Sequence, residues 1–305
     1  MGSEIFAIMV LSTGDSPPKP KKKGKTNMAR TRRVKSMAEG VAHYHLVART
    51  GNKQFLFRKA RTKDVLVDLV KRAAAFSGIA LEAFVMMDNH IHVLCTVTRT
   101  GVKVPEAEIV RRVRVLKGDK AAEELASHLE ELAAAGFTAT LEAELERYRR
   151  RMDDISEFMK TMKELFAIWF KREFDFTGSV WSGAYKSTMV EGGSYFRRCR
   201  RYIQLNPVRA GIVTQVKDYR WVWVGNASES EVFPGCLPDA ALLRRVPQFG
   251  AGKIYGSEGF VRRWIAGLGD RFSAAHVSAH AVGELGFSSH GWRLAKKEEE
   301  ARAAA

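Results

Sequence analysis

The sequence predicts an α+β fold in which helices cover one face of an antiparallel sheet. Three short, β-rich runs lie at residues 41–47, 81–87 and 90–97, and a segment with helical spacing of apolar residues separates the first two. Further along, a long helical region is followed by a short strand ending near Val190 and by another helix. The order strand, helix, strand, strand, helix, strand, helix is typical of a ferredoxin-like sandwich.

Composition and charge limit the possible functions. The chain has 305 residues, of which 46% are hydrophobic, enough for a substantial core. Fifty basic against 34 acidic residues give a net charge of +16, which favours a polyanionic partner, with nucleic acid ahead of an anionic membrane surface. The apolar run 5–11 is too short to span a bilayer and lacks signal-peptide features. The three cysteines, Cys95, Cys199 and Cys236, are odd in number and form no C-x-x-C pair, which indicates a reducing compartment. We therefore expect a cytoplasmic, nucleoid-associated protein, and we expect no membrane partner.

Residues 1–40 are expected to be a flexible basic arm. The stretch 16–25 is rich in proline and lysine, and arginines continue the charge towards residue 35. Such a composition cannot bury enough apolar surface to fold alone. The arm is either a solubilising tail or a contact to DNA phosphates, and the charge pattern does not decide between them.

The first part of the core begins near Val41, with a strand that ends at a turn signal at residues 50–52. A helix is predicted over Asp64–Phe76, with Gly78 as its stop, because apolar residues recur at intervals of three and four. The next two strands, 81–87 and 90–97, should form a hairpin about Asp88-Asn89, since both residue types favour tight turns.

A helical insertion is predicted over residues 99–151, followed by an unusually regular helix. Nine apolar residues recur at alternating intervals of four and three, namely Leu141, Leu145, Tyr148, Met152, Ile155, Met159, Met162, Phe166 and Trp169. Such a heptad stripe indicates either a coiled-coil partner or a long helix packed within the chain. We favour the second interpretation. The N-terminal half of the helix would pack on Leu125, Leu129 and Leu132, and its C-terminal half would lie on the sheet.

The remaining elements follow from glycine and proline positions. Gly192-Gly193 should end the strand near Val190, and Ser194 can cap the next helix, which Pro207 should stop at Asn206. Residues 226–305 are expected to form a small helical region with a stripe of Phe260, Val261, Trp264 and Ile265. His276 and His280 in this region are interpreted as incidental.

Two short segments carry candidate chemistry. In a strand, His90 and His92 present both imidazoles on one face, where they can grip one metal ion. In the last turn of a helix, Tyr202 and Asn206 share a face. His43 and His45 have the same spacing as the first pair, yet we expect no cation site there.

The two segments together resemble a known family. Met-x-Asn-His-x-His-x-Leu at 87–94, followed by Tyr-Ile-x-Leu-Asn-Pro-Val-Arg-Ala-Gly at 202–211, resembles the single-tyrosine HUH transposases, specifically the REP-associated tyrosine transposases. The family's Gly-x-x-Trp-x-x-x-(aromatic)-Lys-Ser pattern is also present, as Gly178, Trp181, Tyr185, Lys186 and Ser187. The resemblance implies a catalytic domain made of residues 41–98 and 152–225.

The resemblance also implies a reaction. His90, His92 and Asn206 would hold a divalent ion, with Mg²⁺ or Mn²⁺ suited to imidazole mixed with a hard oxygen ligand. Tyr202 would attack a phosphodiester in single-stranded DNA beside a hairpin and form a 5′-phosphotyrosine. Lys186, Arg197, Arg198 and Arg201 are candidate DNA contacts, although a basic helix can also be a solvated face.

Several alternatives stay open at the level of sequence. Tyr195 lies seven residues before Tyr202 and can share its helix face, although the Asn-Pro context favours Tyr202. A domesticated protein that binds hairpin DNA without cutting it, or a sheet that reads single-stranded RNA on aromatic residues, would explain the basic charge equally well. Neither explains the histidine pair together with the Tyr-Asn pair. Whether the protein is a monomer or a homodimer is not determined by the sequence.

Overall fold

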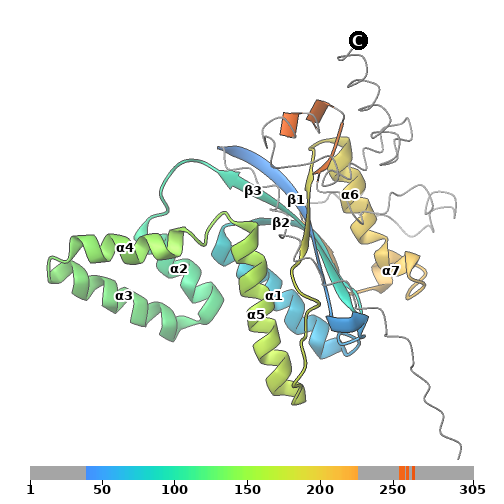
Figure 1. The fold of residues 1–305 in the computed structure, drawn as a ribbon, viewed down its shortest axis with the longest axis horizontal. Helices are drawn as coiled ribbons and strands as arrows, with labels where there is room; N and C mark the ends of the chain where they lie inside the picture. Colours follow the sequence, from blue (N-terminus) through green and yellow to red (C-terminus); the bar gives the residue numbers. More distant parts are fainter. Residues whose placement is uncertain (1–38, 226–253, 258, 261–262, 265–305) are drawn as a thin grey trace, which may run out of the picture. The chain divides into compact units, whose positions relative to one another are not determined.

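The computed structural model describes residues 39–225, 254–257, 259–260 and 263–264. The predictions for the basic arm, for His276 and His280, and for most of the C-terminal region lie outside these residues. The described part is an α+β fold with a six-stranded mixed sheet and seven α-helices (Figure 1). The strands are β1 (Gly40–Arg49), β2 (Ala80–Met86), β3 (His90–Arg99), β4 (Lys186–Val190), β5 (Val222–Val224) and β6 (Ile254–Tyr255). The helices are α1 (Ala60–Ser77), α2 (Glu106–Lys117), α3 (Asp119–Ala134), α4 (Thr138–Arg149), α5 (Ile155–Phe174), α6 (Ser194–Gln204) and α7 (Asn206–Arg209).

The sheet has the strand order β5-β2-β3-β1-β4-β6. Its four central strands are those that the sequence predicted, and all neighbours up to β4 pair antiparallel. The prediction of a wholly antiparallel sheet is wrong at one edge, because β6 pairs with β4 in parallel. The C-terminal region was expected to be helical, so its contribution of a strand was not foreseen.

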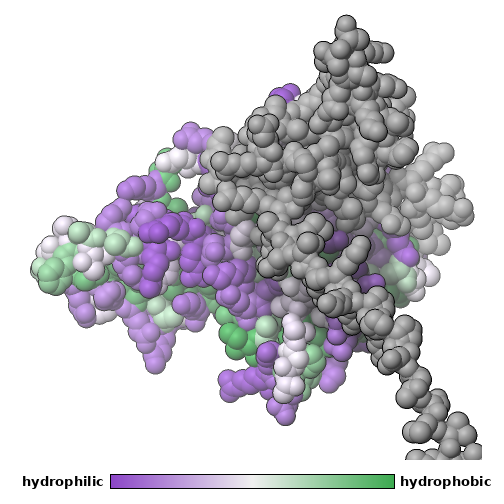
Figure 2. Space-filling view, viewed as in Figure 1, coloured by the Kyte–Doolittle hydropathy of each residue, from purple (hydrophilic) through white to green (hydrophobic). Residues whose placement is uncertain are grey.

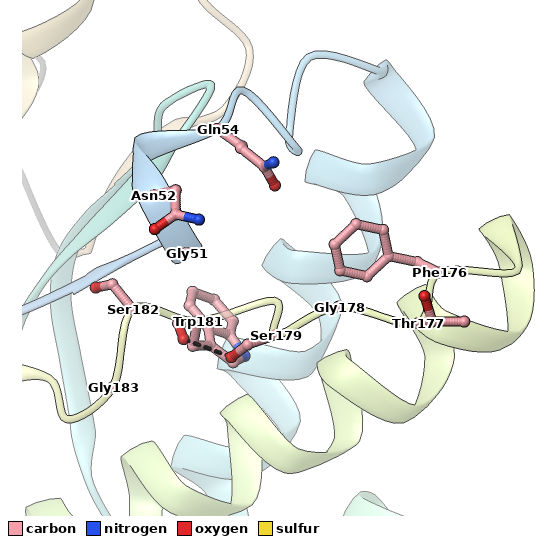
Figure 3. A pocket seen from close by; sticks show the side chains of 10 residues that line it. All are labelled: Gly51, Asn52, Gln54, Phe176, Thr177, Gly178, Ser179, Trp181, Ser182 and Gly183. Atoms are coloured by element: carbon pink, nitrogen blue, oxygen red, sulfur yellow. Dashed lines mark hydrogen bonds between the residues drawn. The ribbon is translucent and has the colours of Figure 1, made fainter. Parts of the chain in front are cut away.

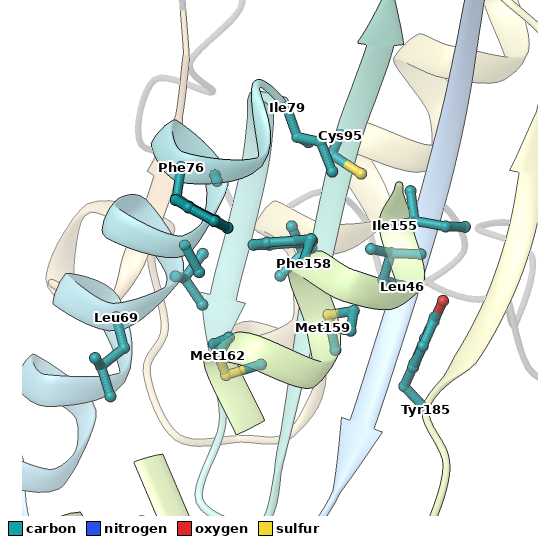
Figure 4. Packing of buried hydrophobic residues seen from close by; sticks show 14 of the residues in the cluster. Leu46, Leu69, Phe76, Ile79, Cys95, Ile155, Phe158, Met159, Met162 and Tyr185 are labelled. Atoms are coloured by element: carbon teal, nitrogen blue, oxygen red, sulfur yellow. The ribbon is translucent and has the colours of Figure 1, made fainter. Parts of the chain in front are cut away.

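The main hydrophobic core lies between the sheet and helices α1 and α5. Figure 4 shows side chains of α5, among them Phe158, Met159 and Met162, lying between α1 and the strands that carry Leu46 and Cys95. Burying a large apolar side chain stabilises a fold by about 1.5–3 kcal/mol, so this layer holds the sheet to its helices. The β3 residue Ile91 is fully buried in the same layer, which fixes the direction of its neighbours His90 and His92.

The prediction that all helices cover one face is wrong for α6. Its buried residues Cys199, Tyr202 and Ile203 belong to a second hydrophobic cluster, together with Val85 and Leu94 from the opposite face of the sheet. The physical reason is strand alternation: the face opposite the main core also carries apolar side chains, and these need a cover. Helix α6 therefore packs on the same face as the two histidines.

The heptad stripe spans two separate helices, and both helices bury stripe residues in the core. The predicted long helix is divided into α4 and α5, because Asp153 adopts a left-handed conformation (φ 50°) and Asp154 caps α5 by accepting from the backbone N–H groups of Ser156 and Glu157. Stripe residues such as Leu145 and Met159 are nevertheless buried in the main core. Packing within the chain, which the sequence analysis favoured over a coiled-coil partner, is what the described residues show.

The range predicted as a helical insertion contains α2, α3 and α4. Buried residues from all three helices, including Val113, Leu129 and Leu145, join the main core. The outer surface of these helices is largely hydrophilic (Figure 2). Ion pairs such as Lys103 with Glu142 lie on this exposed surface, where each contributes little to stability.

Candidate active site

The hairpin between β2 and β3 positions the first histidine. A tight turn at Asp88-Asn89 joins the strands, and the Met87 N–H donates to the His90 carbonyl at 2.8 Å. The segment after β1 holds this loop from outside, since Thr50 N–H donates to the Asn89 carbonyl at 3.0 Å and Phe57 N–H donates to the Asp88 carbonyl at 2.9 Å. The predicted hairpin is therefore confirmed, and its tip is fixed by backbone hydrogen bonds.

His90 and His92 lie on one face of β3, as their spacing predicted. Their ring centroids are 4.9 Å apart, and His92 is 2% exposed. The Nδ1 atom of His90 lies 2.7 Å from Oδ1 of Asn89, whose Nδ2 donates to the Lys53 carbonyl at 3.2 Å. An oxygen that faces Nδ1 can only accept, so His90 donates through Nδ1 and keeps the lone pair on Nε2.

His45 makes a similar contact with His92. Its Nε2 lies 2.8 Å from Nδ1 of His92, and the two rings are stacked with centroids 5.0 Å apart. The other ring nitrogen of His92, Nε2, is buried and has no hydrogen-bond partner. A buried polar atom without a partner costs free energy, so this nitrogen is a natural position for a ligand. The sequence predicted no cation site at His43 and His45, and it did not predict that His45 contacts the candidate ligand His92.

Helix α6 brings Tyr202 to the histidines. The Tyr202 ring lies 5.6 Å from the His92 ring and 6.0 Å from the His45 ring, centroid to centroid, in edge-to-face arrangements. Tyr202 is 8% exposed. Tyr195, the rival tyrosine, packs instead against Tyr255 of β6, with ring centroids 5.1 Å apart.

Asn206 follows α6 and opens the short helix α7. Its Nδ2 donates to the Tyr202 carbonyl at 2.8 Å, which ties the side chain to the end of α6. Oδ1, the atom suited to a metal ion, has no hydrogen bond to any described residue. The helix boundaries differ slightly from prediction, since α6 ends at Gln204, and Gly193 rather than Ser194 occupies its N-cap with φ 67°.

Two arginines that the sequence analysis did not single out flank the cluster. The guanidinium of Arg209 lies over the Tyr202 ring, 5.1 Å from its centroid. Arg49 pairs with His90 in the β1–β3 register, so its side chain leaves the sheet on the histidine face. Arg209 stands in the same motif as Tyr202 and Asn206, which is a signal that the sequence offered.

Burial governs the ionisation of these groups. It lowers the pKa of His45 to about 3 and that of His90 to about 4, the latter with a contribution from the Arg49 charge. The pKa of His92 also falls well below its usual value, through burial first and then through the neighbouring His45. Neutral imidazoles are the form that binds metal ions. Burial raises the pKa of Tyr202, while the Arg209 charge opposes this rise.

Part of the chain matches a known protein family. Residues 40–140 match the family model described as transposase, IS200 like. This match identifies the segment from residue 40 to residue 140 as IS200-like transposase sequence. The matched segment contains the histidine pair and ends before Tyr202.

Two solved structures are similar to this chain. One is a REP-associated tyrosine transposase bound to a REP hairpin, with 17% identity over 70% of this chain and 94% of the other, at a TM-score of 0.41. The second is a putative transposase from Deinococcus radiodurans R1, with 16% identity over 62% of this chain and 98% of the other, at a TM-score of 0.26. A comparison with curated proteins finds no match.

The basic residues proposed as DNA contacts differ in their surroundings. Lys186 pairs with Val47, which in turn pairs with His92, so Lys186 lies on the histidine face and is exposed. Arg197 is exposed on α6, whereas Arg201 is partly buried. Arg198 lies over the Tyr195 ring, 5.7 Å from its centroid, and so is directed towards that tyrosine.

A separate pocket lies beyond the end of β1. It has a volume of about 700 Å³, and its lining consists of Gly51, Asn52, Gln54, Phe176, Thr177, Gly178, Ser179, Trp181, Ser182 and Gly183 (Figure 3). The Gly-x-x-Trp motif forms one wall through Gly178 and Trp181, and Gly51 N–H donates to the Val180 carbonyl at 3.0 Å. None of the histidines lines this pocket. In the part of the chain that the structure describes, no helix is long and apolar enough to cross a membrane.

Proposed function

We propose that this chain is a metal-dependent nuclease and strand transferase for single-stranded DNA, of the REP-associated tyrosine transposase type. The observation that carries the proposal is the meeting of two motifs about a hundred residues apart: His92, with its buried and unpartnered Nε2, lies beside the Tyr202 ring. A structural histidine would normally have its buried ring nitrogens satisfied. Such a cluster is typical of a site that receives a ligand.

The residues present fit a divalent ion. Nε2 of His92 is directed away from its hydrogen bond to His45, and Nε2 of His90 is directed away from Asn89. His90 and His92 would hold Mg²⁺ or Mn²⁺ through these atoms, with the Oδ1 of Asn206 as the third ligand. Such an ion supplies positive charge to the scissile phosphate.

Tyr202 is the proposed nucleophile. Its phenolic oxygen forms a bond to phosphorus while the bond from phosphorus to the 3′ oxygen breaks. The products are a 5′-phosphotyrosine and a free 3′-hydroxyl. The phenol releases one proton to solvent, and the leaving 3′ oxygen takes up one proton from solvent. Because burial raises the pKa of Tyr202, deprotonation needs nearby positive charge, which Arg209 provides.

The charged side chains around the cluster suit a DNA strand. Arg49, Lys186 and Arg209 add positive charge close to the histidine face, within a chain of net charge +16. A flexible single strand can bring one phosphate against Tyr202 more readily than an intact duplex can. The sequence motifs resemble those of transposases that act beside hairpins, so we propose hairpin-bearing single strands as the substrate.

The domain organisation is part of the same proposal. Residues 41–98 and 152–225 would form a ferredoxin-like catalytic domain, since strands β2-β3-β1-β4 and helices α1 and α5 lie in these ranges. Residues 99–151 would be a helical insertion. Residues 1–40 and 226–305 would be an N-terminal arm and a C-terminal region.

The experiment that tests this function is a search for a covalent adduct. The protein is incubated with end-labelled single-stranded hairpin DNA and Mn²⁺, then denatured and analysed by electrophoresis. The wild type should yield a protein–DNA adduct, and Tyr202→Phe should yield none while still binding the hairpin. Tyr195→Phe is the matched control from the same helix, and it should form the adduct almost normally because its ring packs on Tyr255.

Two outcomes would change the conclusion. An adduct from Tyr202→Phe but not from Tyr195→Phe would show that the nucleophile is misassigned. A wild-type protein that binds hairpins tightly yet forms no adduct with Mg²⁺ or Mn²⁺ would favour the non-cleaving binding protein.

A further inference from the structure

We infer that His45 is a positioning residue for the metal site: it accepts a hydrogen bond from Nδ1–H of His92 and thereby leaves the Nε2 lone pair of His92 free for the ion. The inference rests on the proposed function. Nothing in the spacing of the His43-Tyr44-His45 segment distinguishes this role; the contact between His45 and His92 in the structure does.

The ring nitrogens of His45 and His92 are within hydrogen-bond distance. Nε2 of His45 and Nδ1 of His92 are 2.8 Å apart, and both side chains are almost completely buried, at 1% and 2% exposure. Two neutral imidazoles at this distance share one proton, so one nitrogen donates and the other accepts. The hydrogen bond therefore couples the tautomers of the two rings.

The surroundings of His92 favour the tautomer that is protonated on Nδ1 over the one protonated on Nε2. If His45 donated, His92 would carry its own proton on Nε2, and that buried N–H would have no acceptor among the described residues. If His92 donates, Nε2 presents a lone pair, which a cation satisfies. A metal-binding histidine commonly uses its second nitrogen in this way, with a hydrogen bond that fixes ring orientation.

The neighbouring histidine, His90, also has its Nδ1 atom in a hydrogen bond. His90 donates through Nδ1 to Asn89, whose amide orientation is fixed by its bond to the Lys53 carbonyl. Both candidate ligands thus have Nδ1 engaged by a protein acceptor. One acceptor comes from the hairpin and the other from β1, so the two rings are oriented by different parts of the sheet.

His43 provides a matched control for the test. It lies two residues away on the same strand face and also makes a side-chain hydrogen bond, between its Nδ1 and Oγ1 of Thr96 at 2.9 Å. Its ring packs on Phe196, with centroids 4.7 Å apart, and not on His92. A general disturbance of β1 should therefore appear in both His43 and His45 variants, whereas the loss of His92 orientation should appear only in the latter.

The experiment has a readout that requires neither metal nor DNA. Long-range ¹H–¹⁵N spectra of the metal-free protein, labelled at histidine, distinguish the protonated from the bare ring nitrogen. We expect His92 to be protonated on Nδ1 in the wild type. A His92 protonated on Nε2 would overturn the inference directly, even if every His45 variant failed to fold.

Binding of Mn²⁺, followed by electron paramagnetic resonance, gives the second readout. His45→Leu should lose the Nδ1–H signature of His92 and bind Mn²⁺ about 10- to 100-fold more weakly. His45→Gln, whose amide oxygen can accept, should retain both to within a few-fold, and His43→Leu should match the wild type. Wild-type Mn²⁺ affinity in a folded His45→Leu protein would also overturn the inference. Both readouts are independent of strand cleavage, so a failure of the adduct experiment leaves their interpretation intact.

Discussion

The guanidinium carbon of Arg209 lies 5.1 Å from the centre of the Tyr202 ring, above the residue proposed to attack the phosphodiester. The two residues come from consecutive helices, α6 and α7, which meet at Leu205. Arg209 opposes the effect of burial on the pKa of Tyr202, and its position also suits a contact to the phosphate. One side chain can therefore serve both the nucleophile and the group that it attacks.

Replacing this arginine should slow cleavage and move its pH dependence. We expect Arg209→Ala to reduce the rate of adduct formation about 10- to 100-fold, because a charge near the reacting groups is lost. The alkaline rise of the rate should shift to higher pH, since the pKa of Tyr202 is no longer held down. Single-turnover rates between pH 6.5 and 9.5 measure both effects.

Arg197→Ala is the control for this prediction. Arg197 is exposed on α6, so its loss should weaken DNA binding at most a few-fold and leave the pH profile unchanged. An Arg209→Ala protein with the wild-type rate and the wild-type pH profile would contradict the role given to Arg209.

A second prediction concerns the break in the apolar stripe. Asp154 caps α5 by accepting from the Ser156 N–H at 2.6 Å and from the Glu157 N–H at 3.2 Å. Asp154→Ala should reduce the free energy of unfolding by about 0.5–2 kcal/mol. Urea unfolding followed by circular dichroism measures it. Asp119→Ala should cost less, because Asp119 is the first residue of α3 and Gly118 occupies the N-cap; equal losses in both variants would contradict the assignment.

The predictable part of the fold is the part encoded by local pattern. The hairpin was predicted because two β-rich runs flank Asp88-Asn89, and the His90–His92 face because side chains alternate along a strand. The break between α4 and α5 was missed although Asp153-Asp154 offered a signal for a helix start. Seven-residue periodicity does not reveal the break, because stripe residues on both sides of it are buried in the same core.

The missed features depend on pairing between distant residues. Which face α6 covers follows from how it packs on Val85 and Leu94, and no local pattern specifies that choice. The role of His45 depends on the β1–β3 register, in which Val47 pairs with His92, so that His45 lies one step along the same face. Equal spacing therefore concealed two different environments for the His43–His45 and His90–His92 pairs.

The buried histidines predict an acid-sensitive fold. The pKa of His45 is lowered to about 3 and that of His90 to about 4, against about 6.5 in an unfolded chain. Below pH 6.5 the unfolded state therefore binds more protons than the folded state does. The stability contributed by each neutral ring is complete above pH 6.5 and falls by about 1.4 kcal/mol for each pH unit as the pH decreases towards 4.

Urea unfolding in the presence of a chelator, at four pH values between 7.5 and 4.5, measures this slope. His45→Gln should lose stability less steeply on acidification than the wild type, because one buried titrating ring is removed. His128→Gln replaces an exposed histidine on α3 and should follow the wild-type curve. Identical slopes in all three proteins would show that His45 titrates alike in the folded and unfolded chains.

The last prediction joins stability to the metal site through the hairpin tip. Lys63 of α1 is almost fully buried, and its ammonium lies 2.6 Å from Oδ1 of Asp88 and 4.4 Å from the Trp221 ring centroid. Lys63→Met removes this charge and leaves the Asp88 carboxylate, two residues before His90, without its closest cation. We expect the free energy of unfolding to fall by about 1–3 kcal/mol and Mn²⁺ to bind more weakly, because Asn89 and His90 follow directly on the loosened residue.

Arg58 supplies the matched control, because it reaches the same carboxylate from the surface. Its Nε lies 4.0 Å from Oδ2 of Asp88, and the side chain is 69% exposed. Arg58→Met should change the free energy of unfolding by less than about 0.5 kcal/mol and leave Mn²⁺ affinity unchanged. Calorimetric unfolding and Mn²⁺ titration of the two variants separate the buried contact from the surface contact. If Lys63→Met lost stability but bound Mn²⁺ as the wild type does, the hairpin tip would be a structural support only, without influence on the position of His90.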